Sequence, residues 1–380
     1  MTPTLVVVAI SGRALAQSAA KTHSRVVVLD AFGDRDTRAI AEVVRVGADE
    51  GFAVDPDRLV AALAAEPRGS GLAIVVGSGF EGTPELASRL ARYGRLYAND
   101  PAVVAALKDP ELGIALLRAS GWRVPLTQRE PPADRRGWLQ KQTGGAGGTH
   151  VRPARHAAAG PGLYFQREIP GQPLSVTFLA DGDRAYCLGF NRLRVEALGD
   201  ASYCYAGAIA GIGLPHPLRV QAQSSLDRLV RVTGLRGLAG LDFLLDGDGM
   251  TALEVNPRPT ATFELYDDDF PGGLVHWHLA SFERPVPEFG ELLGRGAGTH
   301  RAVGVVYARG PITVPDNVSF PSWCRDLPCV GSIIAADAPV LSVFAEAASS
   351  GEAEREIDAR SRSARELVAR WSGAGRRAVA

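Results

Sequence analysis

Residues 240–259 read GLDFLLDGDGMTALEVNPRP, and this stretch decides the fold. An apolar segment runs to about Leu245, a short run of Asp and Gly follows, and a second apolar segment continues through Val255. Asp and Gly are favoured in tight hairpin turns because they tolerate positive φ angles. The pattern therefore predicts a β-hairpin, with two antiparallel strands joined at the Asp-Gly run.

Three oxygen-bearing side chains are expected to meet on one face of this hairpin. Glu254 and Asn256 are two residues apart, so on a strand they point to the same side. Asp242 lies on the paired strand, where it can face that side too. A few such oxygens suit Mg²⁺, which keeps its other positions for water and phosphate. Arg258, just beyond the second strand, offers a fixed fork of donors for a carboxylate or phosphoryl group.

Length and composition narrow the class of protein. The chain of 380 residues is long enough for two or three domains, and 46% of it is hydrophobic, which is ordinary for a globular protein. A net charge of −1 gives no electrostatic reason to expect a nucleic-acid or anionic-membrane partner. The four cysteines lack a C-x-x-C pair and indicate reduced thiols in a cytoplasmic protein. A metal or redox pair of Cys324 and Cys329 is the alternative.

The first residues combine an apolar run with an A-x-A site at residues 14–16, as a secretory signal does. The run is short, however, and no Lys or Arg precedes it, so a buried first strand entering a helix is the better interpretation. No apolar run approaches the length that spans a membrane.

Strand-like and helix-like segments alternate through the N-terminal quarter of the chain. Strands are expected at residues 4–10, 25–30, 72–76 and 95–98, and helices at residues 13–21, 57–65 and 83–92, with residues 37–46 helical or mixed. This alternation predicts a parallel sheet with helices on both faces. Ligands bind beyond the carboxyl ends of such strands, where residues 11–13 and 77–82 fall. Neither loop is a G-x-G-x-x-G fingerprint, so substrate loops and plain turns are both open.

A lysine and a glycine-rich loop follow the predicted helices. Residues 138–141 read as a strand that ends at Lys141 and leads directly into GGAGGT at residues 144–149. Such a loop lets backbone N–H groups approach phosphates closely, although it is not a Walker sequence and linkers look similar. A second lysine, Lys108, lies between two predicted helices, the second of which is expected to begin at Asp109. Both lysines are candidate phosphate ligands.

Residues 240–259 alone are also compatible with a solvated acidic hairpin, so the context decides. The Asp…Glu-x-Asn-x-Arg pattern, combined with the strand, lysine and glycine loop, resembles the ATP-grasp superfamily, which includes biotin carboxylase, D-alanine–D-alanine ligase and N5-carboxyaminoimidazole ribonucleotide synthetase. The resemblance covers most of the chain and is strongest at residues 108–258. It implies an α/β (α+β) protein with three parts: a Rossmann-like domain at residues 1–100, a two-subdomain ATP-grasp core at 101–295 with a lid at about 122–170, and a small β-rich, biotin-carboxylase-like domain at 296–380.

The resemblance also implies roles for individual residues. The cofactors would be ATP and Mg²⁺ or Mn²⁺, with the metal on Asp242, Glu254 and Asn256. Phosphates would be bound by Lys108, Lys141 and the glycines Gly144, Gly145, Gly147 and Gly148. The adenine would be read by Gln166 and Ile169, in the hinge at residues 163–171. The candidate catalytic residues are Arg258, Lys141 and Arg192. For Arg192, a solvated strand edge is the alternative.

Two positions depart from the family pattern. Gln166 stands where the hinge usually has Glu, and Pro173 stands where many ligases of the superfamily have a Glu that holds the ribose. The preference for ATP over GTP therefore stays open. Among the remaining motifs, His276-Trp277-His278 has the wrong spacing for a helical metal pair and predicts a packed helix, and the three aspartates at 267–269 predict a loop.

Three functions are compatible with the resemblance. The first is an ATP-dependent ligase (ADP-forming) that activates a carboxylate as an acyl phosphate for attack by an amine. The second is a carboxylase that acts on bicarbonate through carboxyphosphate, and the third is a non-catalytic ATP-binding sensor. GSGFE at 77–81, NPRPT at 256–260 and WCRDLP at 323–328 are similar to ATP-grasp proteins found beside tetrahydromethanopterin or methanofuran pathway genes, which suggests ligation in coenzyme biosynthesis. The expected partners are small carboxylate and amine substrates, with no nucleic acid or membrane, in a cytoplasmic homodimer.

Overall fold

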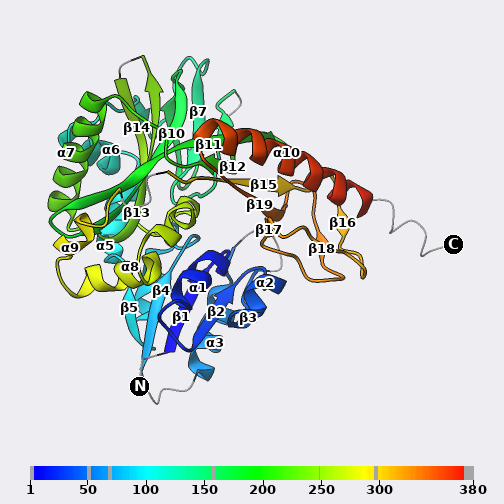
Figure 1. Ribbon diagram of the computed structural model, residues 1–380. Coiled ribbons are helices and arrows are strands. Elements are labelled where there is room, and N and C mark those ends of the chain that lie inside the picture. Colours follow the sequence, from blue (N-terminus) through cyan, green and yellow to red (C-terminus); the bar gives the residue numbers. More distant parts are fainter. Residues whose placement is uncertain are drawn as a thin grey trace.

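The computed structural model describes residues 4–48, 53–66, 71–155, 159–247, 249–294 and 298–371. The N-terminal unit is a five-stranded parallel sheet with the order β3-β2-β1-β4-β5, as the alternation predicts (Figure 1). Its strands are β1 (Thr4–Ala9), β2 (Val26–Asp30), β3 (Glu42–Arg45), β4 (Leu72–Val76) and β5 (Arg95–Tyr97). Its helices are α1 (Arg13–Ala19), α2 (Arg35–Arg38), α3 (Pro56–Ala65) and α4 (Pro84–Leu90). The central strands are buried along their whole length because helices cover both faces.

Residues 37–46, expected to be helical or mixed, are mixed. Residues 37–46 contain the end of α2 and all of β3, an edge strand paired with β2. All four residues of β3 are exposed or half-buried, so the strand carries only a weak apolar signal.

A large antiparallel sheet forms the second unit and has the order β14-β13-β10-β11-β12-β15-β19-β17. Its first five strands along the chain are β10 (Gln172–Asp181), β11 (Ala185–Leu198), β12 (Ala201–Ile209), β13 (Arg236–Asp246) and β14 (Gly249–Asn256). The predicted hairpin is β13–β14, in which Asp242 pairs with Glu254 and Gly240 with Asn256. The turn residue Asp248 lies outside the described residues. Helix α7 (His216–Thr233) packs its apolar side on this sheet.

Two helices and a smaller sheet precede the large sheet along the chain. The helices are α5 (Pro101–Lys108) and α6 (Leu112–Ala119). The small sheet has the order β6-β9-β7-β8 and consists of β6 (Thr127–Gln128), β7 (Trp138–Gln142), β8 (Arg152–Pro153) and β9 (Leu163–Arg167). Helix α6 begins later than predicted, because the Asp109 carboxylate accepts the backbone N–H groups of Glu111 and Leu112 at 3.0 and 2.9 Å just before the first helical turn.

The C-terminal strands continue the large sheet. β15 (His300–Tyr307) pairs with β12, β19 (Pro339–Ala347) pairs with β15, and β17 (Cys324–Arg325) is the edge. Helix α10 (Ser350–Ala369) runs along β15 and β19 (Figure 1). The short strands β16 (Ile312–Thr313) and β18 (Ile333–Ile334) form a separate pair. Strands from both sides of the predicted domain boundary therefore belong to one sheet.

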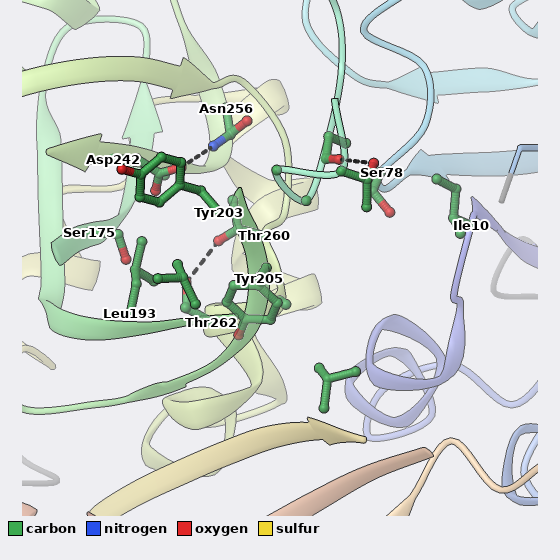
Figure 2. Close-up of a pocket in the computed structure, with 18 of the residues that line it drawn as sticks. Ile10, Ser78, Ser175, Leu193, Tyr203, Tyr205, Asp242, Asn256, Thr260 and Thr262 are labelled. Atoms are coloured by element: carbon green, nitrogen blue, oxygen red, sulfur yellow. Dashed lines mark hydrogen bonds between the residues drawn. The ribbon is translucent and has the colours of Figure 1, made fainter. Parts of the chain in front are cut away.

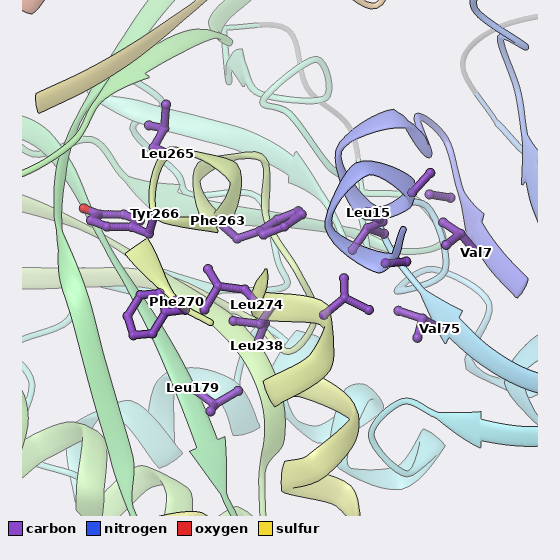
Figure 3. Packing of buried hydrophobic residues seen from close by; sticks show 14 of the residues in the cluster. Val7, Leu15, Val75, Leu179, Leu238, Phe263, Leu265, Tyr266, Phe270 and Leu274 are labelled. Carbon is purple, nitrogen blue, oxygen red and sulfur yellow. The ribbon is translucent and has the colours of Figure 1, made fainter. Parts of the chain in front are cut away.

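Short helices connect β14 to the C-terminal strands and dock on the N-terminal unit. They are η1 (Ala261–Leu265), η2 (Asp267–Asp269), α8 (Gly273–Glu283) and α9 (Pro287–Gly290). Figure 3 shows Leu15 of α1 facing Phe263 and Leu274 in one shared apolar core. Asp267 fixes this junction, since its carboxylate binds Lys21 at 2.6 Å and Ser18 at 2.5 Å. The three aspartates that were predicted as a loop form the short helix η2, and Asp267 connects this helix to residues 18 and 21 of the N-terminal unit.

The remaining sequence motifs also have structural roles. His278 lies inside α8, accepts the backbone N–H of Leu238 at Nδ1 (2.9 Å) and contacts the Tyr97 carbonyl through Nε2 (3.1 Å). The prediction of a packed helix is confirmed, and burial lowers the pKa of His278 to about 4. All four cysteines are free thiols. In the described part of the chain, every helix is too short or too polar to cross a membrane.

Candidate active site

A cavity of about 1210 Å³ lies between the N-terminal sheet, the small sheet and the large sheet. It is lined by the loops after β1 and β4, the glycine-rich loop, the end of the β13–β14 hairpin, η1 and the C-terminal strands. Figure 2 shows Ile10 and Ser78 on one side and Asp242 and Thr260 on the other. The volume exceeds that of a typical single-ligand pocket and is large enough for a nucleotide and a second substrate.

The three predicted metal ligands meet at one end of this cavity. Asp242, Glu254 and Asn256 all line it, and the Asn256 amide donates to Asp242 Oδ2 at 3.2 Å. Their carbonyl and carboxylate oxygens are hard donors of the kind Mg²⁺ prefers. Only two of the three are acidic, and the described residues hold no group of three or more His, Cys, Asp or Glu side chains arranged around a metal position.

Lys108 reaches this cluster from the last turn of α5. Its Nζ donates to Asn256 Oδ1 at 2.8 Å and to Glu254 Oε2 at 3.3 Å, and the residue is 7% exposed. Burial alone would raise the pKa of Glu254, but the charges of Lys108 and Lys141 outweigh it and the pKa of Glu254 falls. Burial and the neighbouring Glu254 charge raise the pKa of Asp242.

Lys141, on strand β7, lies near the same oxygen cluster. It is 9% exposed, and its Nζ donates to Gln166 Oε1 on the paired strand β9 at 2.7 Å. Burial lowers its pKa, while Glu254 and Asp242 act in the opposite sense. Gln166 also donates to Thr127 at 3.3 Å, so its side chain is fixed at both ends and positions Lys141. Ile169, the other predicted hinge residue, lines the cavity.

The glycine-rich loop covers this end of the cavity. Gly147 accepts the Tyr205 N–H at 2.9 Å, which joins the loop to β12. A Cβ on Gly148 would lie 1.9 Å from the Tyr203 carbonyl oxygen, and φ at Gly148 is +73°. On the other flank, a Cβ on Gly144 would lie 2.4 Å from the Cα of Gly82, in the loop after β4. The loop is thus closed against two neighbouring segments that only glycine allows it to approach.

The glycine loop also carries a residue that the sequence reasoning did not single out. A Cβ on Gly145 would lie 2.4 Å from the ring of His150, which lines the cavity near Glu254. Burial lowers the pKa of His150 despite the Glu254 charge, and its Nδ1 has no hydrogen-bond partner among the described residues. Its position directly after the glycine-rich loop was the available signal, because a histidine beside a loop that binds phosphate can contact the phosphate.

Arg258 has a partner that the sequence did not reveal. Its Nε binds Glu81, from the loop after β4, and its Nη1 donates to the Pro259 carbonyl at 3.1 Å. Burial would raise the pKa of Glu81, but Arg258 and Lys108 lower it to about 2. Glu81 also accepts the N–H groups of Gly79 and Phe80, both at 3.1 Å. The 77–82 loop is therefore part of the site and aims the guanidinium.

The structure places Arg192 among other residues than those of the cavity. Leu193, the next residue on β11, lines the cavity, and Arg192 points to the other face of the strand. Arg192 binds both carboxylate oxygens of Glu354 on α10 at 3.0 Å, and Arg194 binds Asp358 at 2.6 Å. Both arginines hold α10 on the sheet.

Hydroxyl groups form the floor of the cavity beyond Asp242, Glu254 and Asn256, and aromatic rings form its wall. The Thr262 hydroxyl contacts those of Thr260 at 2.9 Å and Thr177 at 2.7 Å. The Thr177 hydroxyl in turn accepts the buried side-chain amide of Asn191 at 3.0 Å. Figure 2 shows Tyr203, Tyr205 and Leu193 over this floor, and Val303, Val305 and Tyr307 extend the wall. The floor is polar and fixed, whereas the wall is apolar and suits a ring or an aliphatic group.

Comparison with known proteins identifies the fold family. Residues 112–262 match the family model described as an ATP-grasp domain. The matched range contains β7, the glycine loop, the hinge and the β13–β14 hairpin, and thus Lys141 and the three candidate metal ligands. This part of the chain is similar to ATP-grasp domains. A search of curated protein sequences gives no significant match.

Solved structures with the same fold extend over nearly the whole chain. The biotin carboxylase domain of Hydrogenobacter thermophilus 2-oxoglutarate carboxylase, in complex with MgADP, ADP and bicarbonate, has a TM-score of 0.72 at 14% identity and covers 94% of this chain and 89% of that one. Campylobacter jejuni biotin carboxylase has a TM-score of 0.71 at 13% identity, over 92% and 89%. The L-amino acid ligase of Bacillus licheniformis has a TM-score of 0.68 at 13% identity, over 94% and 97%. The three share the fold but differ in the reactions their names state.

Proposed function

We propose that this chain is an ATP-dependent, ADP-forming ligase that activates a substrate carboxylate as an acyl phosphate for attack by an amine. The observation that carries the proposal is the convergence of Lys108, Lys141 and Arg258 with an oxygen cluster under one closed glycine loop. Cations and phosphate-facing backbone groups suit a triphosphate, and the oxygen cluster suits the metal that accompanies it. The MgADP complex of the Hydrogenobacter thermophilus domain supports the same nucleotide here.

The donor set fits Mg²⁺ or Mn²⁺. Asp242, Glu254 and Asn256 would hold the metal with their oxygens, because the arrangement is hard, partly anionic and open to the cavity. The bound metal would supply charge neutralisation and a fixed orientation for the phosphates. Lys108, now bound to Glu254 and Asn256, would contact the phosphates beside the metal.

Each further residue then has a defined task. Lys141, held by Gln166, neutralises phosphate charge, and the backbone of residues 144–148 covers the phosphates and excludes water. The hinge residue Ile169 supplies a backbone N–H for the base. Arg258, aimed by Glu81, binds the substrate carboxylate and then the acyl phosphate.

The chemistry explains why ATP is needed. A carboxylate is a poor acyl donor, since attack by an amine would have to expel oxide. Its oxygen attacks the γ-phosphorus, ADP leaves, and the acyl phosphate forms. The uncharged amine then forms the C–N bond as the C–O bond to phosphate breaks. Phosphate leaves with the electron pair and takes up the proton that the amine loses. The protein's contribution is positioning and charge stabilisation.

The cavity favours ligation over activation of bicarbonate. Bicarbonate is a single small anion, whereas this cavity continues past Arg258 along Thr260, Thr262 and a wall of Tyr203, Tyr205 and Tyr307. An apolar aromatic wall suits a ring-bearing substrate and is in keeping with ligation in coenzyme biosynthesis. A homodimer is also part of the proposal, and the Hydrogenobacter thermophilus domain is described as a dimer.

The test is ADP release from MgATP with a panel of carboxylic acids, with hydroxylamine as a general amine trap. The panel should contain amino acids, pterin- and furan-bearing acids, and bicarbonate. ADP and hydroxamate that appear together with one acid support acyl-phosphate chemistry and identify the donor. ADP release with bicarbonate alone would replace the ligase by a carboxylase, and MgATP binding without ADP release from any acid would favour a sensor.

A further inference from the structure

The end of the cavity farthest along η1 is acidic. The chain reaches Glu264 six positions after Arg258. Residues 259–263, between the two, all line the cavity. Asp34, from the loop between β2 and α2, and Asp326, just after β17, line the same end. We call Asp34, Glu264 and Asp326 the acidic end. Three segments that are far apart in the sequence therefore bring carboxylates to one place.

Arg13 is the cation within this end, but its donors are occupied. Its Nε binds Asp326 at 2.8 Å, its Nη2 binds Glu264 at 2.8 Å, and its Nη1 binds Gln17 at 2.8 Å. The residue is 3% exposed. Arg13 is thus a structural counter-ion and is poorly placed to receive a substrate carboxylate. The charge of Arg325 also acts on Glu264, so two guanidiniums oppose three carboxylates and leave a formal surplus of one negative charge when all are ionised.

Asp34 is the carboxylate without a partner. It is 6% exposed and lines the cavity, yet within the described residues its side chain has no hydrogen bond and no ion pair, not even to the helix that it precedes. A buried carboxylate without a partner is costly. Burial, and then the charges of Asp326, Asp30 and Asp36, raise the pKa of Asp34 well above its usual range.

The neighbouring aspartates do have hydrogen-bond partners, so a carboxylate without a partner is not a general feature of this region. Asp30 accepts the N–H groups of Gly12 at 3.1 Å and Gly33 at 2.8 Å. Asp36 accepts those of Asp326 at 2.8 Å and Leu327 at 2.9 Å. These two carboxylates hold the backbone, whereas Asp34 faces the cavity and is left for a ligand.

We propose that the acidic end is the acceptor subsite of the ligase and binds a positively charged amino group of the amine substrate. This inference rests on the proposed function and specifies its second substrate as a cationic amine. A cation supplies the partner that Asp34 lacks and balances the surplus charge of the acidic end. The two ends of the cavity then select opposite charges: Lys108, Lys141 and Arg258 attract phosphates and the donor carboxylate, and the acidic end repels them.

The test compares a cationic probe with its neutral counterpart. Binding of 1,4-diaminobutane and of 1,4-butanediol to the full chain is measured by calorimetry in the presence of MgADP. The diamine is expected to bind and the diol is not. Asp34→Asn should weaken diamine binding by about fivefold or more, because a buried charge-assisted contact is lost. Asp34 makes no contact that the fold needs, so the variant should keep the wild-type melting temperature.

A matched control is available in Asp57, an exposed aspartate on α3 that does not line the cavity. Asp57→Asn should bind the diamine as the wild type does. Equal diamine affinity in wild type and Asp34→Asn, or no difference between diamine and diol, would overturn the subsite. MgADP affinity should be the same in all three proteins, which shows that the nucleotide end is intact.

Hydroxylamine separates this inference from the proposed function, since it is largely uncharged at neutral pH and does not need the acidic end. In Asp34→Asn, hydroxamate formation from the donor acid should persist while transfer to cationic amines falls. Loss of both reactions in equal measure would overturn the acceptor role. Absence of ADP and hydroxamate in the wild type, with Asp34-dependent diamine binding, would overturn the ligase and leave a cation site.

Discussion

Lys108 at the end of α5 binds Asn256 at the end of β14, with 2.8 Å between Nζ and Oδ1. The contact joins two segments 148 residues apart and places a buried ammonium inside the oxygen cluster. A lysine in this position neutralises the carboxylates while no metal is bound and can contact phosphates when one is. The same side chain therefore stabilises the free protein and takes part in the proposed site.

Glu254 is expected to be indispensable for turnover. Glu254→Gln removes an anionic metal ligand with little change in shape, and ADP release should fall by about a thousandfold or more because metal-assisted charge stabilisation is lost. Asp246→Asn, at the exposed tip of the same hairpin, is the matched control and should retain activity. Normal activity in Glu254→Gln would remove the hairpin from the mechanism.

Glu81 is expected to contribute to stability in a pH-dependent way. The folded-state pKa is about 2, below the ordinary value of 4.5, so the stabilisation is complete above pH 4.5 and is lost as the pH falls towards 2. Its magnitude is on the order of 3 kcal/mol. Denaturant unfolding of wild type and Glu81→Gln should differ most above pH 5 and converge on acidification. A difference that stayed constant with pH would contradict this account.

The glycine loop allows a paired test of closure. Gly147 and Gly148 have similar φ angles of +65° and +73°, but a Cβ would meet nothing within 4 Å at Gly147 and the Tyr203 carbonyl at Gly148. Both Ala variants bear the backbone strain, whereas only Gly148→Ala should prevent the loop from reaching β12. MgATP affinity should fall about tenfold further in Gly148→Ala than in Gly147→Ala. Equal affinities would mean that the closed loop is not the binding state.

Arg192 is expected to be dispensable for chemistry. Its side chain is 30% exposed and binds Glu354 on α10, on the face of β11 opposite the cavity. Arg192→Ala should change the steady-state kcat/KM by less than about twofold and stability by no more than about 1 kcal/mol. A large loss of kcat with an unchanged melting temperature would return Arg192 to the active site.

The residues that could be predicted are those fixed by local pattern. The alternation in residues 240–259 was enough to predict the hairpin and to place Glu254, Asn256 and Asp242 on one face, because strand periodicity determines the side of each residue. Lys141 followed in the same way from its position before the glycine loop. The N-terminal α/β unit was predictable because its buried strands are continuous apolar runs.

The residues that could not be predicted depend on contacts between distant segments. Glu81 meets Arg258 across 177 residues, and Asp326 meets Arg13 across 313. For Arg192, a site residue and a strand edge were both open because β11 is half-buried on both sides, so its pattern does not reveal which side meets the cavity. The pairing of β12 with β15 likewise joins strands whose own sequences do not indicate that one sheet contains both.

The most direct test of the central claim follows an oxygen atom. The donor acid is labelled with ¹⁸O in its carboxylate, and the phosphate released during ligation is examined by mass spectrometry. Activation as an acyl phosphate predicts one ¹⁸O in the phosphate for each amide formed. Amide formation with unlabelled phosphate, or with the label in AMP, would contradict the account.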